Sequence, residues 1–173
     1  GASPETNVRV EPHSRKLTIT PIAGTRPRGR DQHGNLNQDL DSRYETELRL
    51  SEKEVAEHMM LVDLARNDVA RVCQSGTRHV QDLLRVERYQ HVMHLVSTVE
   101  GQLKDDFDTL HAYQSSMNMG TLTGAPKVRA MQILKDVETT RRGPYGGAIG
   151  ILSSDGSLDS AIIIRSALVK DSV

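Results

Sequence analysis

The sequence predicts an α+β protein in which antiparallel strands are flanked by helices. Alternating apolar and polar residues on either side of a turn indicate a β-hairpin near the start of the chain, and the turn Asp155-Gly156 separates two apolar segments near its end. Between them, Ser51 to Glu54 matches the capping box that opens a helix. A chain of 173 residues is long enough for one domain with a single core.

Composition and charge exclude several classes of protein. Lys and Arg number 22 against 23 Asp and Glu, so the net charge of −1 gives no overall field toward nucleic acid or an anionic membrane. No apolar run approaches the roughly 20 residues of a membrane span. The single cysteine, Cys73, excludes an internal disulfide and fits a reducing compartment. We therefore expect a soluble, cytoplasmic protein with no membrane or nucleic-acid partner. Because the chain begins without methionine and stops directly after an expected strand, we also expect a fragment.

The first segments predict a hairpin followed by irregular chain. Residues 8–11 and 17–22 alternate in polarity, with turn residues between them. Residues 21–30 hold two prolines and two glycines, which predicts a loop. Residues 31–44 are polar and predict an exposed connection.

The loop at residues 21–30 also permits a nucleic-acid interpretation, because it carries Arg26, Arg28 and Arg30. Binding of single strands needs stacking platforms as well, and the whole chain has one Phe, four Tyr and no Trp. This alternative therefore rests on the three arginines alone.

The helix expected from Ser51 to Asn67 or Val72 places two carboxylates beside an apolar stripe. Glu54 and Glu57 share a face with Leu61 and Leu64, at intervals of three and four residues. A charge beside apolar surface needs a compensating cation, and magnesium accepts one or two carboxylates together with water and substrate oxygens. Alternatively, Glu54 closes the capping box, and Glu57 pairs with Arg66 or another arginine.

Residues 79–103 predict two strands. His91 and His94 lie three residues apart in the second, so they point to opposite faces and do not clamp one metal ion. Because His94 lies between Met93 and Leu95, its position alone favours a structural role.

Two later segments suggest contacts with an anion. A polar helix is expected over residues 105–116. Residues 120–134 then join a glycine-rich turn to a second helix, with Thr123 as its N-cap and Pro126 in its first turn. The first turn of that helix favours a carboxylate or phosphate, but this stretch alone is more typical of an ordinary loop entering a core helix. Further along, four glycines surround Tyr145, and Arg165 lies in the apolar run of residues 158–169. An arginine buried there would need a carboxylate.

Together these segments resemble the chorismate-utilising enzymes. The motifs that carry the resemblance, in chain order, are Ser3-Pro-Glu5, Pro21-Ile-Ala-Gly-Thr25, Glu54-Val-Ala-Glu57-His58, Leu61-Val-Asp-Leu-Ala-Arg-Asn-Asp68, His94-Leu-Val-Ser97, Gly120-Thr-Leu-Thr-Gly-Ala-Pro-Lys127, Arg142-Gly-Pro-Tyr-Gly-Gly-Ala-Ile-Gly150 and Ile162-Ile-Ile-Arg-Ser-Ala-Leu168. The resemblance implies a layered fold of antiparallel sheets, with residues 1–173 forming a portion of the chorismate-binding catalytic domain. It is strongest to the branch that converts chorismate and ammonia, with magnesium, to anthranilate and pyruvate in tryptophan biosynthesis. In that branch a glutamine amidotransferase subunit supplies the ammonia, and the complete enzyme is expected to be an oligomer.

The resemblance also implies roles for particular residues. Glu57 matches a magnesium ligand and Glu54 its acidic neighbour. Glu5 matches a general acid for the departing ring hydroxyl, and His94 the residue that assists elimination of pyruvate. The matched substrate contacts are Gly24, Thr25, Thr121, Tyr145 and Arg165.

Ala23 distinguishes between branches of the family, and the length of the chain bears on its activity. Ala23 stands where a related branch has a nucleophilic lysine, which favours direct attack by ammonia. The family's amino-terminal half and its final segment, which bears further magnesium-binding carboxylates, are absent, so we expect little or no activity from this chain alone. The alternatives are the branch that forms isochorismate or salicylate with water, a nucleic-acid-binding module and a non-catalytic interaction fragment.

Overall fold

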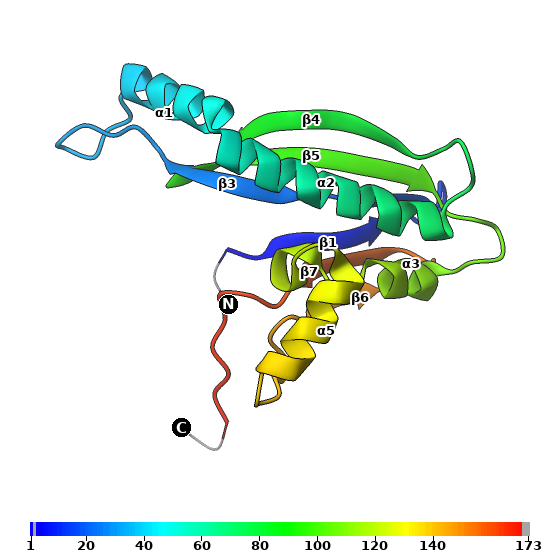
Figure 1. Ribbon diagram of the computed structural model, residues 1–173. Helices are drawn as coiled ribbons and strands as arrows, with labels where there is room; N and C mark the ends of the chain where they lie inside the picture. The colour runs from blue at the N-terminus through cyan, green and yellow to red at the C-terminus, as the bar shows by residue number, and fades with distance from the viewer. Residues whose placement is uncertain (2, 171–173) are drawn as a thin grey trace.

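The computed structural model describes residues 1 and 3–170, and over these residues the chain forms one antiparallel sheet with helices against it (Figure 1). The seven strands are β1 (Glu5–Val10), β2 (Lys16–Ile19), β3 (Ile22–Pro27), β4 (His79–Arg88), β5 (Val92–Gln102), β6 (Ala148–Leu152) and β7 (Leu158–Ile162). The helices are α1 (Gln38–Leu50), α2 (Glu52–Val72), α3 (Thr109–Ser116), α4 (Gly120–Thr123) and α5 (Lys127–Val137). The α+β class is therefore confirmed, although the described residues form a single sheet.

Strand β5 organises the sheet. It pairs with β4 along one side and with β3 and then β2 along the other. The order continues from β2 through β1 and β7 to β6, so the first strand of the chain lies between the second and the last. The predicted hairpins β1–β2 and β6–β7 are present, and the two strands predicted over residues 79–103 are β4 and β5, which pair with each other.

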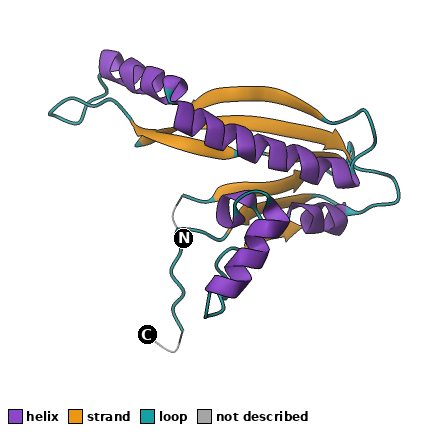
Figure 2. Cartoon of the chain, in the orientation of Figure 1, coloured by secondary structure: helices purple, strands orange, loops and turns teal. Residues whose placement is uncertain are grey.

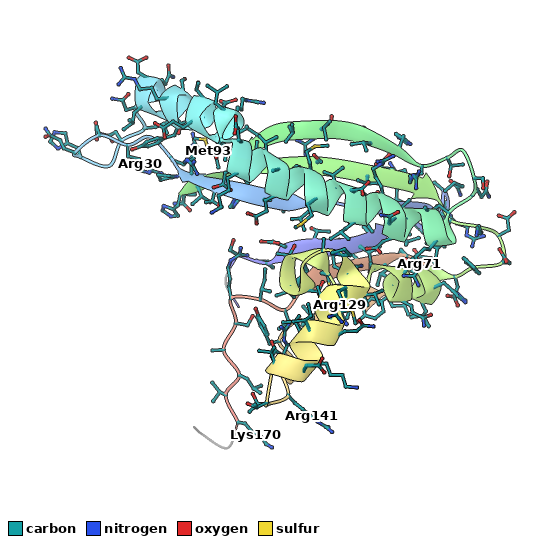
Figure 3. The ribbon with its side chains drawn as sticks, in the orientation of Figure 1. Arg30, Arg71, Met93, Arg129, Arg141 and Lys170 are labelled. Carbon is teal, nitrogen blue, oxygen red and sulfur yellow. The ribbon has the colours of Figure 1, made fainter. Side chains whose placement is uncertain are left out.

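The core lies between the sheet and the helices. Helix α2 buries a stripe that faces strands β1, β2 and β5, and its buried members include Val62, Ala65 and Val69. A second cluster joins Leu48 of α1 to Met93 and Leu95 of β5. Figure 2 shows α2 running along the sheet, and Figure 3 marks Met93 close to the junction of α1 and α2.

Two expectations for the first quarter of the chain were wrong. Residues 22–27 form strand β3 rather than a loop, because their backbone finds a ladder on β5 and a bulge at Gly24 absorbs the irregularity. Proline is tolerated because β3 lies at an edge and Pro27 is its last residue. Residues 38–50 form α1 rather than an exposed connection, with the Asn37 side chain accepting a hydrogen bond from the backbone N–H of Leu40 at 3.0 Å.

The segment after residue 105 also differs from expectation. Helix α3 begins at Thr109, because Asp108 rather than Asp105 or Asp106 caps it. Thr123 caps no helix: it belongs to the short α4, and its hydroxyl donates to the carbonyl of Met119 at 3.2 Å. Helix α5 starts only at Lys127, and its apolar side chains are not buried within the described residues.

The last strand is shorter than predicted. Strand β7 ends at Ile162, where its ladder with β1 ends at the pair Glu5–Ile162. Beyond this pair β1 offers no further residue, so Arg165 lies outside the sheet, is exposed and adopts a positive φ of 48°. None of the helices in the described part of the chain combines the length and the apolar character needed to cross a membrane.

Candidate active site

The β3–β5 ladder brings three of the predicted residues together. Thr25 pairs with His94 across the strands, and the Nδ1 atom of His94 lies 3.0 Å from Thr25 Oγ1 and 3.1 Å from the carbonyl oxygen of Gly24. A carbonyl oxygen only accepts hydrogen bonds, so Nδ1 carries the proton and donates it. Among the described residues, Nε2 of His94 has no hydrogen-bond partner, which leaves its lone pair available as a base.

Helix α2 adds a carboxylate beside these residues. A Cβ placed on Gly24 would lie 3.3 Å from Oε2 of Glu54, so the start of α2 approaches β3 closely where Gly24 adopts φ +75°. The carboxylate of Glu54 accepts a hydrogen bond from Arg26 Nη1 at 3.4 Å. The backbone N–H of Glu54, and not its side chain, contacts Ser51: it donates to Ser51 Oγ at 3.4 Å. Only this half of the capping box is therefore present, and the Glu54 side chain does not close it.

Glu57 lies one turn further along α2 and is exposed. The alternative that it pairs with Arg66 or another arginine is wrong: Arg66 Nη1 pairs with Asp63 at 3.1 Å, and Glu57 forms no ion pair with any arginine among the described residues. No group of three or more potential metal-ligating side chains occurs within residues 1 and 3–170. Glu54 and Glu57 by themselves offer the hard oxygen donors that magnesium prefers, and this ion commonly takes one or two carboxylates and completes its shell with water and substrate.

The two ends of the described chain meet at a second group. Arg165 Nη2 donates to Glu5 Oε1 at 2.8 Å, and Arg165 Nη1 donates to the carbonyl of Ser3 at 2.9 Å. The Glu5 side chain is 11% exposed and that of Arg165 is 49% exposed. Burial of Arg165 was therefore predicted wrongly. Its contact with a chorismate carboxylate stays a prediction, and in the free chain its guanidinium pairs with the Glu5 carboxylate instead.

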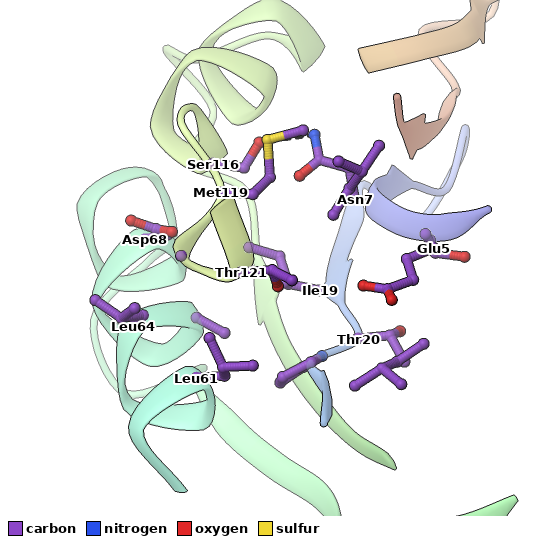
Figure 4. Close-up of a pocket in the computed structure, with 16 residues that line it drawn as sticks. Glu5, Asn7, Ile19, Thr20, Leu61, Leu64, Asp68, Ser116, Met119 and Thr121 are labelled. Atoms are coloured by element: carbon purple, nitrogen blue, oxygen red, sulfur yellow. Dashed lines mark hydrogen bonds between the residues drawn. The ribbon is translucent and has the colours of Figure 1, made fainter. Parts of the chain in front are cut away.

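Glu5 and Thr121 line one cavity (Figure 4). Its other lining residues come from the β1–β3 region, α2, α3, α4 and β7, and include Asn7, Leu61, Leu64, Asp68, Ser116 and Met119. The cavity is partly open to solvent, and its volume of about 50 Å³ has room for water molecules. Pockets for small molecules are about 300–1,000 Å³, so a ligand would need the open side of this cavity.

Tyr145 lies apart from both groups. It is 49% exposed, and the guanidinium carbon of Arg142 lies 5.6 Å from its ring centroid. A cavity of about 640 Å³ between α5 and the glycine-rich segment includes Tyr145 but none of the other predicted site residues. The structure thus joins Gly24, Thr25, His94 and Glu54 in one place and Glu5, Arg165 and Thr121 in another, and does not bring Tyr145 to either.

The arginines that suggested nucleic-acid binding are engaged within the chain. Arg28 makes a two-pronged pair with Asp41, at 2.8 and 2.9 Å, and this pair holds the pKa of the Asp41 carboxyl below its ordinary value. Arg30 donates to the carbonyls of Gly34 and Gln90 at 2.6 and 2.7 Å. Together with the Arg26–Glu54 contact, these bonds give each of the three arginines a partner within the chain.

Sequence reasoning missed two buried polar contacts. Lys127 Nζ lies 2.7 Å from Asp68 Oδ2. A cation in the first turn of a helix opposes the helix dipole, and this was the available signal that Lys127 needs an anion. Nε2 of His58 lies 2.6 Å from Ser97 Oγ, while His58 Nδ1 is buried without a partner among the described residues. The signal there was the position of His58 four residues before Val62, on the core stripe of α2.

Comparison with known proteins agrees with the motifs. The family model described as chorismate binding enzyme matches residues 1–173. The chain is 64% identical over 173 residues to anthranilate synthase component 1 of Vibrio cholerae, covering 100% of this chain and 33% of that protein. The crystal structure of anthranilate synthase component I from Streptococcus pneumoniae superposes with a TM-score of 0.82 at 41% identity, over 95% of this chain and 34% of that one.

A more distant structure shares the fold. A putative 2,3-dihydroxybenzoate-specific isochorismate synthase from Bacillus anthracis superposes with a TM-score of 0.76 at 25% identity, covering 95% of this chain and 42% of the other. The chain spans about a third of the length of the curated relatives it matches.

Proposed function

This chain belongs to the family of chorismate binding enzymes, and from this we propose that it carries part of the catalytic site of an anthranilate synthase component 1. The reaction would have two steps. Ammonia adds to the chorismate ring as the ring hydroxyl leaves as water, which gives aminodeoxyisochorismate. That intermediate then loses a ring proton and its enolpyruvyl group, which departs as pyruvate and leaves anthranilate.

The observation that carries the proposal is the arrangement of His94. Its Nδ1–H is held by the Gly24 carbonyl, so the ring is fixed and the free Nε2 can accept a proton. We assign to Nε2 the ring proton that is lost in the second step. Gly24 and Thr25 would border the substrate, because they lie on β3 next to His94 of β5.

The Glu5–Arg165 pair suggests how chorismate could engage Glu5. In the free chain, Arg165 Nη2 lies 2.8 Å from Glu5 Oε1 and holds this carboxyl group. A carboxylate of bound chorismate would compete for the exposed Arg165 guanidinium, which presents a two-pronged donor. Glu5, released from Arg165, would act as the general acid for the departing ring hydroxyl, with Thr121 at the same cavity as a further substrate contact.

Magnesium is proposed as the cofactor on the donor chemistry of α2. Glu57 and Glu54 would hold the ion, with Glu57 as the principal ligand because Glu54 already faces Arg26. When bound, the ion would neutralise charge on a substrate carboxylate and orient the ring.

Ammonia rather than a protein amine is the proposed nucleophile. Ala23 is buried and has no amine, so no covalent adduct can form at this position. A glutamine amidotransferase subunit as ammonia source, tryptophan biosynthesis as the pathway, assembly into an oligomer, a cytoplasmic location and a contact between Tyr145 and substrate remain predictions that rest on the family.

The test uses the chain within a complete relative, because the chain spans a third of one. The 173 residues replace the matching third of Vibrio cholerae anthranilate synthase component 1, and we call the product the exchange protein. With chorismate, magnesium and ammonium, the exchange protein should form anthranilate, and the fluorescence of anthranilate measures its formation. Isochorismate or salicylate as the main product, or no product from a folded exchange protein, would refute the proposal.

A further inference from the structure

A buried ion pair joins α2 to the start of α5. Lys127 Nζ lies 2.7 Å from Asp68 Oδ2, and each side chain is only 12% exposed. The two residues are 59 positions apart in the sequence. None of the steps proposed above uses this pair.

Stability does not explain the pair. Burial raises the pKa of the Asp68 carboxyl above its ordinary value, and the nearby ammonium only partly offsets this. Taking two charges out of water costs about as much as their attraction returns, so buried pairs contribute little net stability and serve in several proteins to fix one arrangement over others. Lys127 also occupies the unfavourable end of the α5 dipole, and no side chain caps that end.

The neighbouring contacts show what the pair could fix. Leu61, Leu64 and Asp68 lie on one face of α2 and line the same cavity as Glu5 and Thr121. Gly120 packs so closely on this face that an added Cβ would overlap Leu64 Cδ1. Residues 120–127 therefore touch α2 at both ends, through Gly120 at one end and Lys127 at the other.

Thr121 is the residue directly after Gly120 in the chain. Figure 4 shows Asp68, Leu64 and Leu61 along α2, with Thr121 between them and Glu5. If the Lys127 contact were lost, the segment would still be held by the apolar contacts of Gly120 and Leu122 and by the hydrogen bond from Arg142 Nη1 to the Leu122 carbonyl at 3.4 Å. These contacts lie at residues 120 and 122, and α5 has no buried residue that could hold the other end of the segment.

We propose that the Asp68–Lys127 ion pair is a positioning device that holds residues 120–127 on α2 and thereby sets the place of Thr121 opposite Glu5. The inference rests on the proposed function, in which both residues serve the substrate. Asp68 and Lys127 themselves are positioning residues.

The first experiment needs no activity. Amide hydrogen exchange over residues 119–130 is compared in the 173-residue chain and in the double variant Asp68→Leu, Lys127→Met. Apolar replacement of both partners should leave the thermal midpoint unchanged or raised, while exchange of the Leu122, Thr123 and Gly124 amides becomes about tenfold faster. The single variant Lys127→Arg keeps a cation opposite Asp68, so its amides should exchange as slowly as those of the unaltered chain. Equal exchange in the chain and the double variant, or no protection in the unaltered chain, would overturn the inference.

The second experiment measures kcat/KM for chorismate in the exchange protein. The double variant should have a kcat/KM about tenfold lower than the unaltered exchange protein. The single variant Lys127→Arg, which keeps the ion pair, should retain most of the kcat/KM. The matched control is Asp63→Asn with Arg66→Gln, which removes an exposed pair from the same helix and should change neither readout. Faster amide exchange with unchanged kcat/KM would refute the positioning role. If the exchange protein folds with the ion pair intact but forms no anthranilate, the proposed function is refuted. The positioning inference would then be tested by the amide hydrogen exchange measurement alone.

Discussion

At the scale of single residues, the proposed chemistry depends on which nitrogen of His94 is free. Its neighbours Met93 and Leu95 are buried and give no sign of function. The sign lies on another strand, because Gly24 contributes a carbonyl that can only accept and so fixes the proton on Nδ1. Sequence reasoning named His94 from its motif, but it could not identify the tautomer, which depends on a partner 70 positions away.

We predict that His94→Gln lowers kcat for anthranilate formation by about 10²- to 10⁴-fold, the usual effect of removing a general base. The glutamine amide can still donate to the Gly24 carbonyl but supplies no basic nitrogen. Aminodeoxyisochorismate should accumulate, because the first step does not use His94, and chromatography of the exchange protein's reaction mixture checks this. His91→Gln, three residues away on an exposed side chain, serves as control and should leave kcat unchanged. A similar loss in both variants would argue against the role of Nε2.

His58 provides a prediction about pH. The side chain is fully buried, and burial lowers its pKa below the ordinary value of 6.5. The folded chain therefore binds fewer protons at this site than the unfolded chain, so the stability contributed by neutral His58 is present above about pH 6.5 and is lost as the pH falls toward the lower folded pKa.

Urea unfolding between pH 7.5 and 5 measures this effect. The free energy of unfolding should fall on acidification with a contribution from His58 of at most about 1.4 kcal/mol per pH unit. His58→Met should be less stable at pH 7.5, because the hydrogen bond to Ser97 is lost, but its stability should fall less steeply with acid. Identical slopes for the two proteins would contradict the assignment.

At the scale of elements, β3 and α1 show where local sequence signals fail. Prolines and glycines in residues 21–30 are turn residues by local preference, yet the edge of β5 provides a ladder that outweighs them. Residues 38–50 lack a broad apolar stripe, and α1 is fixed instead by Leu48 in the core and by the buried Asp41–Arg28 pair. In contrast, α2, the hairpins β1–β2 and β6–β7, and the strands β4 and β5 carry strong local patterns, and these were predicted correctly.

Gly24 tests the close approach of β3 to α2. At φ +75°, an added Cβ would lie 3.0 Å from Leu48 Cδ1 and 3.3 Å from Glu54 Oε2. We predict that Gly24→Ala lowers the free energy of unfolding by about 1–3 kcal/mol, through backbone strain and crowding together. Gly34→Ala is the matched control, because Gly34 has φ +84° with nothing within 4 Å of the added Cβ. It should show the backbone cost alone, so equal losses in urea unfolding would mean that crowding at Gly24 is absent.

At the scale of the whole molecule, the site depends on contacts that are distant in sequence. Strand β1 lies between β2 and β7, and this order brings Glu5 within 2.8 Å of Arg165, 160 positions away. The sequence identified both residues, each from its own motif, but not their pairing with each other. The pairing depends on where the β1–β7 ladder ends, which no local pattern specifies.

The most direct test of the account is the rate of anthranilate formation by the exchange protein as magnesium is varied, with Glu57→Gln and Glu52→Gln measured side by side. Both residues are exposed on α2, but only Glu57 is assigned to the ion. Loss of a metal ligand should abolish the rate or raise the half-saturating magnesium concentration at least about 100-fold, by analogy with losses of 10- to 100-fold for outer partners of metal ligands. Glu52→Gln should leave the curve unchanged. A Glu57→Gln protein with the same rate and the same magnesium dependence as the unaltered exchange protein would contradict the assignment of this chain's carboxylates to the reaction.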